Sequence, residues 1–392
     1  MDYFKESLIL HRNLKGKIRI TPKIDVRTIE ELSLVYSPGV AEPCREIYKN
    51  VETVYDYTFK GNMVAIVSDG SAVLGLGNIG AHASIPVMEG KALLFKRFAN
   101  IDAFPICLDT QDPDEIVETV KRIAPVFGGI NLEDIAAPKS FYIERKLQDL
   151  GIPVFHDDQH GTAIVVLAGL INSAKVVGKN LFGLKVVING AGAAGDAIAR
   201  LLKCQDPELS DQCVAVQDII VCDTKGIISS KRTDLNDAKK ELLAFTNNND
   251  MSGTLKDALR GADVFIGVSV ANILTSDDIR TMAKDPIIFG LANPTPEIMP
   301  DQCYIGGAAI VATGRSDMPN QVNNALGFPG IFRGALDVRA KRISANMKLA
   351  AAFALADYVK EPSKEMIIPP TLNEQVAWTV AEAVKKAALR EM

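Results

Sequence analysis

Two acidic pairs near the middle of the chain have the residue types of a divalent-metal site. Glu133 and Asp134 follow a short apolar segment, and Asp157 and Asp158 follow the next one. Open α/β sheets hold their ligand-binding residues at the carboxyl ends of strands, where both pairs would then lie. Carboxylate oxygens are the hard ligands that Mg²⁺ and Mn²⁺ prefer. Three of these four carboxylates could therefore share one cation.

A glycine-rich loop is a candidate site for a dinucleotide. The segment Gly190-Ala191-Gly192-Ala193-Ala194-Gly195 fits the pattern G-x-G-x-x-G, with an apolar strand before it and a helix after it. Such glycines allow a tight turn, a close approach of the backbone to a pyrophosphate and close helix packing. Asp223 ends the next strand and could bind the ribose hydroxyls of the adenosine, which favours NAD, although Lys225 leaves NADP possible. The competing interpretation is a helix start that uses small residues only for packing.

The acidic residues also have structural alternatives. Asp134 could cap a helix that starts at the next residue, and Asp158 could cap the helix that follows it. A single acidic pair would favour capping, whereas two pairs beside a dinucleotide loop favour a metal. His156 and His160 flank the second pair, but a zinc-binding histidine pair with this spacing needs a helix, and the segment begins as the end of a strand. We therefore do not expect zinc.

Lys91 and Tyr36 are further residues that could take part in chemistry. Lys91 lies in a mostly apolar helical stretch, where a lone charge is costly unless it points into a polar pocket. Burial would lower the pKa of this lysine and make it a usable base. The alternative is a lysine whose charged end reaches water. Tyr36 lies on a Pro/Gly turn, where a core tyrosine is the default interpretation.

The elements that must position these residues alternate between strand and helix, which predicts a parallel α/β fold. A first series of strands is expected at 64–67, 103–108, 129–131 and 153–155, and a Rossmann-like second series at 185–188, 219–222, 264–267 and 287–290. We predict an N-terminal α/β domain for substrate and metal (1–160), a Rossmann-like dinucleotide-binding domain (161–324) and a C-terminal helical segment (325–392) that packs back on the first domain.

The composition excludes several classes of protein. With 392 residues, two domains and a crevice between them are the natural expectation. A formal net charge of -5 offers nucleic acid no electrostatic attraction. The longest strongly apolar stretch, 163–171, is about half a membrane span by length. The six cysteines form no C-x-x-C pair, so we expect buried, reduced thiols. We predict a soluble, cytoplasmic protein without a nucleic-acid or membrane partner.

Several ordered motifs resemble those of malic enzymes, specifically the short prokaryotic type. The likeness extends from Tyr36-Ser37-Pro38-Gly39-Val40-Ala41 to Phe328-Pro329-Gly330 and so covers most of the chain. Between these ends lie Ser68-Asp69-Gly70, Leu74-Gly75-Leu76-Gly77-Asn78, Glu89-Gly90-Lys91, Asn131-Leu132-Glu133-Asp134, the pair Asp157-Asp158, Ala292-Asn293-Pro294-Thr295 and Asn323-Asn324.

The resemblance implies oxidation of L-malate by NAD or NADP and decarboxylation of the product to pyruvate. It makes Tyr36 the general acid and Lys91 the general base. It assigns the metal, Mg²⁺ or Mn²⁺, to Glu133, Asp134 and Asp158, with Asp157 in support. Asn293 and Asn324 would contact the substrate carboxylate, with Asn293 also at the coenzyme. A homo-oligomer, most simply a homodimer, is expected.

One departure from the family concerns the substrate carboxylate. The larger eukaryotic enzymes carry an arginine in the loop that here reads Gly70-Ser71-Ala72-Val73, so another group must bind that carboxylate. Three other functions stay open at this point. They are a malolactic conversion of malate to lactate with bound NAD, a Rossmann dehydrogenase without metal, and a non-catalytic NAD-binding sensor.

Overall fold

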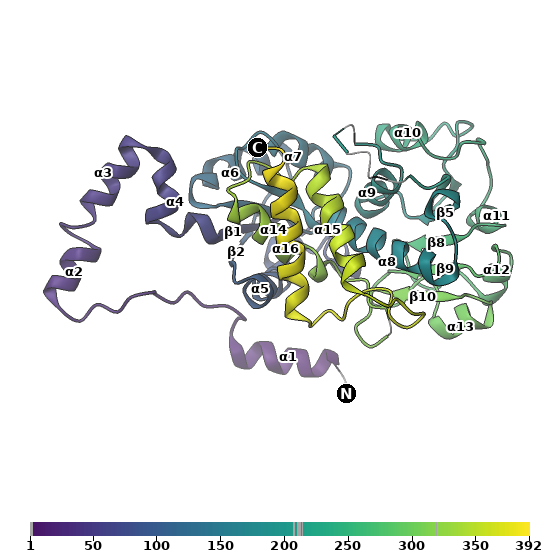
Figure 1. The fold of residues 1–392 in the computed structure, drawn as a ribbon, viewed down its shortest axis with the longest axis horizontal. Coiled ribbons are helices and arrows are strands. Elements are labelled where there is room, and N and C mark those ends of the chain that lie inside the picture. Colours follow the sequence, from purple (N-terminus) through teal and green to yellow (C-terminus); the bar gives the residue numbers. More distant parts are fainter. Residues whose placement is uncertain (1–2, 207, 210–212, 214, 319) are drawn as a thin grey trace.

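The structure, a computed structural model, describes residues 3–206, 208–209, 213, 215–318 and 320–392. It contains two sheets, a four-stranded one with the order β2-β1-β3-β4 and a six-stranded one with the order β10-β9-β8-β5-β6-β7 (Figure 1). The first sheet is formed by β1 Met63–Ser68, β2 Asp102–Cys107, β3 Gly129–Leu132 and β4 Val154–His156, all parallel. The second is formed by β5 Lys185–Asn189, β6 Asp218–Asp223, β7 Gly226–Ile227, β8 Val264–Gly267, β9 Ile287–Gly290 and β10 Ile310–Thr313.

The second sheet has the topology expected of a dinucleotide-binding unit. Its strands are parallel except for β7, which pairs with β6 in the antiparallel sense. The chain runs from β5 to β6 on one side and then continues through β8, β9 and β10 on the other. Such a reversal of strand order creates a crevice at the carboxyl ends of the strands, where ligands bind. The predicted α/β fold class is confirmed.

Helices cover both sheets. The first sheet is flanked by α5 Gly80–Ala99, α6 Pro113–Ile123 and α7 Lys139–Leu147. The side chain of Asp112 caps the start of α6, because it accepts hydrogen bonds from the backbone N–H groups of Asp114 and Glu115. The second carries α9 Ala193–Leu202, α10 Asp237–Leu243, α11 Leu255–Leu259, α12 Ser276–Arg280 and α13 Pro300–Ile305. Short 3₁₀ turns lie at Val51–Thr53, Phe59–Asn62, Leu74–Leu76, Ala124–Val126, Leu181–Gly183 and Asn324–Leu326.

The C-terminal helices α14 Phe328–Asp337, α15 Ala345–Tyr358 and α16 Glu374–Leu389 return to the first sheet, as predicted (Figure 1). The ring of Phe95 on α5 packs edge-on against Phe328 and Phe332 of α14, with ring centroids 4.7 and 5.3 Å apart. Aromatic pairs at such distances stabilise beyond the area that they bury.

Helix α8, Thr162–Val177, joins the two halves of the molecule. Together with the preceding turn it forms a segment, Asp157–Val177, that is long and apolar enough to cross a membrane by length and composition. Within the protein 67% of that segment's apolar window is buried, and α8 belongs to one core cluster with β1, β5 and α16. Its all-round hydrophobicity is therefore that of a core helix between two sheets. The predicted domain boundary at residue 160 lies just before this helix and stays a prediction.

The N-terminal arm, residues 3–57, projects outward from the two sheets (Figure 1), although Lys17 donates to Glu89 and Pro86 of α5 and Asp56 pairs with Arg339. It contains α1 Tyr3–Leu14, α2 Ile29–Val35, α3 Ala41–Lys49 and α4 Val54–Tyr57, and none of these helices buries a residue. Many large apolar side chains on the arm are exposed, among them Phe4, Leu8, Ile20, Ile29 and Leu34. Exposed apolar side chains in such number are a mark of an interaction surface.

The cysteines depart from the prediction. Cys204 and Cys213 form a disulfide across the loop between α9 and β6, with Cα atoms 6.0 Å apart. Cys44 is exposed, Cys107 is half-buried, and Cys222 and Cys303 are buried free thiols. The expectation of reduced, buried thiols therefore holds for Cys222 and Cys303. It is wrong for Cys204 and Cys213, which the loop brings within bonding distance, and Cys44 and Cys107 are free but not buried. The cytoplasmic location stays a prediction.

Candidate functional site

Three carboxylates from two neighbouring strand ends meet at the edge of the first sheet. Glu133 and Asp134 follow β3, Asp158 follows β4, and one oxygen of each lies within 4.8 Å of the others. In the described part of the chain this is the one group of its kind. Burial raises the pKa values of Glu133 and Asp158 above their ordinary range, with a further contribution from carboxylates nearby. A bound cation would relieve both effects, so the donor set fits Mg²⁺ or Mn²⁺.

The backbone around the carboxylates is arranged to hold them. The backbone N–H of Asp134, which has a φ of 53°, donates to Asp158 Oδ2 at 2.8 Å. The side-chain amide of Asn131 donates to Glu133 Oε2 at 2.8 Å. Neither aspartate caps a helix, because α7 begins only at Lys139 and the residue before α8 is Gly161, without a side-chain cap. The capping alternative is therefore wrong.

Lys91 reaches the same cluster from α5 and is buried, with 7% of its surface exposed. Its Nζ donates to Glu133 Oε1 at 2.7 Å and to Asp157 Oδ2, and it lies 4.1 Å from the ring centroid of Phe328. The charge therefore points inward, and the alternative of a lysine that reaches water is wrong. Burial by itself lowers the pKa of Lys91, but the carboxylates of Asp157 and Glu133 raise it more, so the net pKa is above the ordinary value. The prediction that the pKa of Lys91 is lowered was wrong, because the apolar sequence around Lys91 does not show that Asp157 and Glu133 lie opposite it in the fold.

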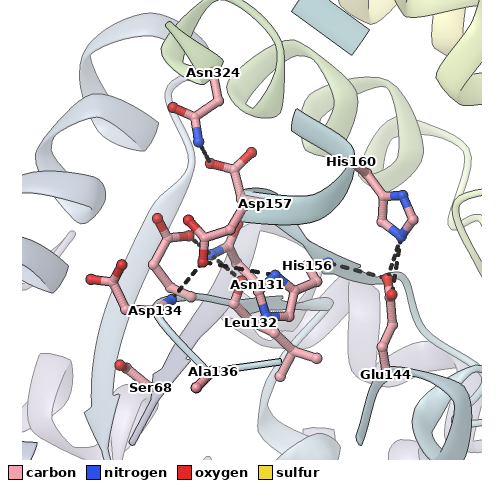
Figure 2. Close-up of polar contacts among 12 residues, drawn as sticks. Ser68, Asn131, Leu132, Asp134, Ala136, Glu144, His156, Asp157, His160 and Asn324 are labelled. Carbon is pink, nitrogen blue, oxygen red and sulfur yellow. Dashed lines mark hydrogen bonds and ion pairs between the residues drawn. The ribbon is translucent and has the colours of Figure 1, made fainter. Parts of the chain in front are cut away.

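Asp157 links this cluster to the C-terminal part of the chain. Its Oδ2 accepts a hydrogen bond of 2.5 Å from Asn324 Nδ2, and Figure 2 shows the two side chains pointing at each other. A Cβ at Gly161 would lie 1.9 Å from Asp157 Oδ1, so only glycine leaves room for this carboxylate. Asn324, predicted to contact the substrate, thus belongs to the site that holds Lys91 and the three carboxylates predicted to bind a metal.

Tyr36 is not part of this group. It follows α2 on the N-terminal arm, and 69% of its surface is exposed, so the default interpretation as a core tyrosine is also wrong. Asn293 lies in an exposed loop after β9, where a Cβ at Gly75 would come within 2.5 Å of the Asn293 carbonyl oxygen. Asn293 therefore contacts the loop at Gly75, which follows β1 of the first sheet. Among the described residues, no hydrogen bond joins Asn293 to Lys91.

The two histidines lie in different surroundings, and the expectation of no zinc there stays a prediction. Residues Asp157–Gly161 form a single π-helical turn, η5, rather than a strand end. His160 Nε2 lies 2.9 and 3.0 Å from the two carboxylate oxygens of Glu144 on α7 (Figure 2). His156 is buried, and burial lowers its pKa to about 4, so that it is neutral at pH 7. Glu144 is a site residue that the sequence did not reveal, since nothing near it in the chain distinguishes it from a surface glutamate.

The loop between β5 and α9, which contains Gly190 and Gly195, has the geometry of a phosphate-binding turn. Gly190 has a φ of 123°, which favours glycine, and a Cβ there would lie 2.6 Å from Val268 O. A Cβ at Gly195 would lie 1.8 Å from Gly190 O, so the first turn of α9 packs directly on the loop. Helix α9 begins at Ala193 without a side-chain cap, which leaves its first N–H groups available to an anion. The loop thus serves close packing and offers a pyrophosphate site at once.

Asp223 ends β6 as predicted, but two cations hold it. Arg232 donates through Nη1 and Nη2 at 2.8 and 3.0 Å, and Lys239 Nζ donates at 2.6 Å. Although burial raises the pKa of Asp223, these hydrogen bonds lower it to about 2. Lys225 pairs instead with Asp234 at 2.9 Å. The end of β6 therefore combines the carboxylate that we predicted to bind ribose with two cations that the sequence had not indicated.

Comparisons with known proteins agree with this geometry. Residues 15–148 match the family model "Malic enzyme, N-terminal domain", and residues 159–389 match "Malic enzyme, NAD binding domain". The chain is 56% identical to the bifunctional malic/malolactic enzyme of Bacillus subtilis (strain 168), over 99% of this chain and 94% of that protein. It is 52% identical to the NAD-dependent malic enzyme of Geobacillus stearothermophilus, over 96% of this chain and 78% of that one. The crystal structure of an NAD-dependent malic enzyme from Thermotoga maritima superposes with a TM-score of 0.91 at 49% identity, covering 97% and 98% of the two chains.

Proposed function

The chain belongs to the malic enzyme family, and we propose that it catalyses the oxidative decarboxylation of L-malate to pyruvate and CO₂ with a nicotinamide coenzyme. The observation that carries the proposal is the buried Lys91, which bridges Asp157 and Glu133 beside a three-carboxylate cluster. Buried charged groups at a strand edge are costly to fold and are typical of active sites.

Glu133, Asp134 and Asp158 are proposed to hold the divalent cation, Mg²⁺ or Mn²⁺. Their oxygens are close enough to share one ion, and burial raises the pKa values of Glu133 and Asp158 although Lys91 lowers both, so a cation would stabilise their ionised forms. When bound there, such a cation would act as a Lewis acid that stabilises negative charge on the C2 oxygen of malate.

The side chains of the site have distinct tasks in this proposal. A cation held by Glu133, Asp134 and Asp158 would weaken the hold of the carboxylates on the proton of Lys91, and Lys91 in its neutral form would then take the proton of the C2 hydroxyl while the C2 hydride passes to the nicotinamide. Cleavage of the bond between C3 and the C4 carboxylate then releases CO₂ and leaves the enolate of pyruvate. Asn324, fixed by Asp157, orients the substrate carboxylate, and Tyr36 protonates C3 to give pyruvate. The burial of Lys91 and Asp157 keeps water away from these steps.

A homodimer accounts for the position of Tyr36. In one chain Tyr36 lies on an exposed arm that buries none of its own helical residues. A second copy offers both a partner for the exposed apolar side chains of the arm and an active site in need of an acid. We therefore propose that the arm packs on the partner subunit and supplies Tyr36 to the partner's site.

NAD is the proposed coenzyme, with NADP as a weaker substitute. The carboxylate of Asp223 suits ribose hydroxyls and repels a 2′-phosphate, whereas Arg232 and Lys239 beside it would attract that phosphate. Replacement Asp223→Asn removes the repulsion and keeps the cations. We expect the ratio of kcat/KM for NADP to that for NAD to rise by about 10- to 100-fold, the effect of one charged hydrogen bond.

Steady-state kinetics with both coenzymes measure this change. Asp234→Asn is the matched control, because Asp234 also binds Arg232 but lies farther along the chain from the end of β6. It should shift the ratio much less. An Asp223→Asn enzyme with the wild-type ratio would show that Asp223 does not select the coenzyme.

The assay that tests the function combines malate with NAD⁺ or NADP⁺, with and without EDTA. Reduced coenzyme should form in equal amount with pyruvate and CO₂, and EDTA should abolish the reaction until Mn²⁺ or Mg²⁺ is added in excess. Lactate without accumulation of reduced coenzyme would instead indicate a malolactic enzyme, an outcome worth measuring because the Bacillus subtilis relative is named bifunctional. Turnover that EDTA leaves unchanged would contradict the metal site, and coenzyme binding without turnover would indicate a sensor.

A further inference from the structure

Glu144 holds both ends of the π-helical turn that carries Asp157 and Asp158. At one end its Oε1 accepts the backbone N–H of His156 at 3.3 Å, and at the other both of its oxygens contact His160 Nε2, at 2.9 and 3.0 Å. Figure 2 shows Glu144 and His160 on the side of the turn away from Asn324 and Asp134. A single side chain from α7 thus bridges His156, directly before Asp157, and His160, two residues after Asp158.

The turn needs such an anchor because of its geometry. A π-helical turn is rare and occurs where side chains must be re-aimed, commonly at functional sites. Here it directs Asp158 toward Glu133 and Asp134, while Asp157 faces Lys91 and Asn324. If the turn relaxed to an ordinary α-helical turn, these two carboxylates would change direction relative to β3.

The environment of Glu144 indicates a role beyond packing. The residue is buried, with 8% of its surface exposed, and a buried carboxylate destabilises the fold unless its partners compensate. Glu144, Gln159, His160 and Lys348 also line a cavity of about 670 Å³ on this side of the turn. Water from that cavity could replace the hydrogen bonds of a shortened side chain, but it could not fix the position of His160. Loss of Glu144 should therefore loosen the turn more than it unfolds the protein.

We propose that Glu144 is a positioning residue, which keeps η5 in the conformation that brings Asp158 within reach of a cation shared with Glu133 and Asp134. Glu144 touches none of these three carboxylates itself and acts through His156 and His160. The inference rests on the proposed function, since it assigns the three carboxylates to a metal.

The test measures Mn²⁺ binding directly, by calorimetry on the intact protein without malate, and kcat and the KM for Mn²⁺ in parallel. Glu144→Ala should weaken Mn²⁺ binding by about 10- to 100-fold, the usual effect of removing a residue that orients metal ligands. Glu144→Gln keeps the length of the side chain and one acceptor oxygen, so its Mn²⁺ affinity should fall much less. Arg145→Ala is the matched control, since Arg145 is the exposed neighbour on the same helix and should bind Mn²⁺ like the wild type.

Each result decides the proposal. A Glu144→Ala protein with lower thermal stability but wild-type Mn²⁺ affinity would make Glu144 a merely structural residue and overturn the inference. If that variant does not fold, His160→Gln takes its place, and unchanged Mn²⁺ affinity there would overturn the inference in the same way. A wild type that binds Mn²⁺ but does not turn over malate would refute the proposed function alone, while the affinities of the variants would still decide the role of Glu144.

Discussion

Replacement of Lys91 by alanine is expected to abolish malate oxidation, with kcat falling by about 10²- to 10⁴-fold, the contribution of a positioned general base. The amine lies between Asp157 and Glu133 and is buried, so no water molecule in its place could take the hydroxyl proton with the same geometry. The two carboxylates would also lose their buried partner, which should lower stability by about 3–5 kcal/mol. Absorbance of the reduced coenzyme and a thermal melt measure the two effects.

The control for this variant lies one turn farther along the same helix. Lys96 is exposed and pairs with Asp102 at 2.8 Å, so Lys96→Ala changes the same charge without reaching the site. Surface pairs of this kind contribute about 0–1 kcal/mol, and turnover should be unchanged. Near-normal turnover by a folded Lys91→Ala enzyme that still binds coenzyme would refute Lys91 as the base.

Two inactive variants, Tyr36→Phe and Lys91→Ala, should restore each other's activity when their subunits are mixed. In a dimer that exchanges arms, a mixed pair has one site with the Lys91 of one chain and the Tyr36 of the other. Random exchange gives half of the dimers this composition and one complete site in each, so about a quarter of wild-type activity should return. The measurement is malate-dependent coenzyme reduction after the subunits have been dissociated and reassociated together.

The matched control mixes Tyr36→Phe with the double variant Tyr36→Phe/Lys91→Ala, which cannot form a complete site in any pairing. That mixture should stay inactive. If the first mixture also stays inactive although the two variants form mixed dimers, Tyr36 acts within its own chain or not at all, and the exchange of arms is wrong.

The sequence was enough to predict the four strands of the first sheet, four strands of the second and the grouping of three carboxylates, but it did not predict β7 or β10. Period and composition are local properties, so the predicted segments at 64–67, 185–188, 264–267 and 287–290 coincide with β1, β5, β8 and β9 to within one residue at either end. Because parallel strands end at one edge of a sheet, the position of Glu133, Asp134 and Asp158 after β3 and β4 was enough to bring them together.

Which groups face one another depends on packing between segments that are distant in the sequence. Lys91 meets Glu133 and Asp157 at separations of 42 and 66 residues, and this proximity reversed the expected direction of its pKa shift. Glu144, the two cations at Asp223 and the exposed position of Tyr36 were likewise invisible, since each depends on how helices and loops pack around the sheets. Periodicity states which face of an element is buried, whereas the partner on the other side is set by packing between distant segments.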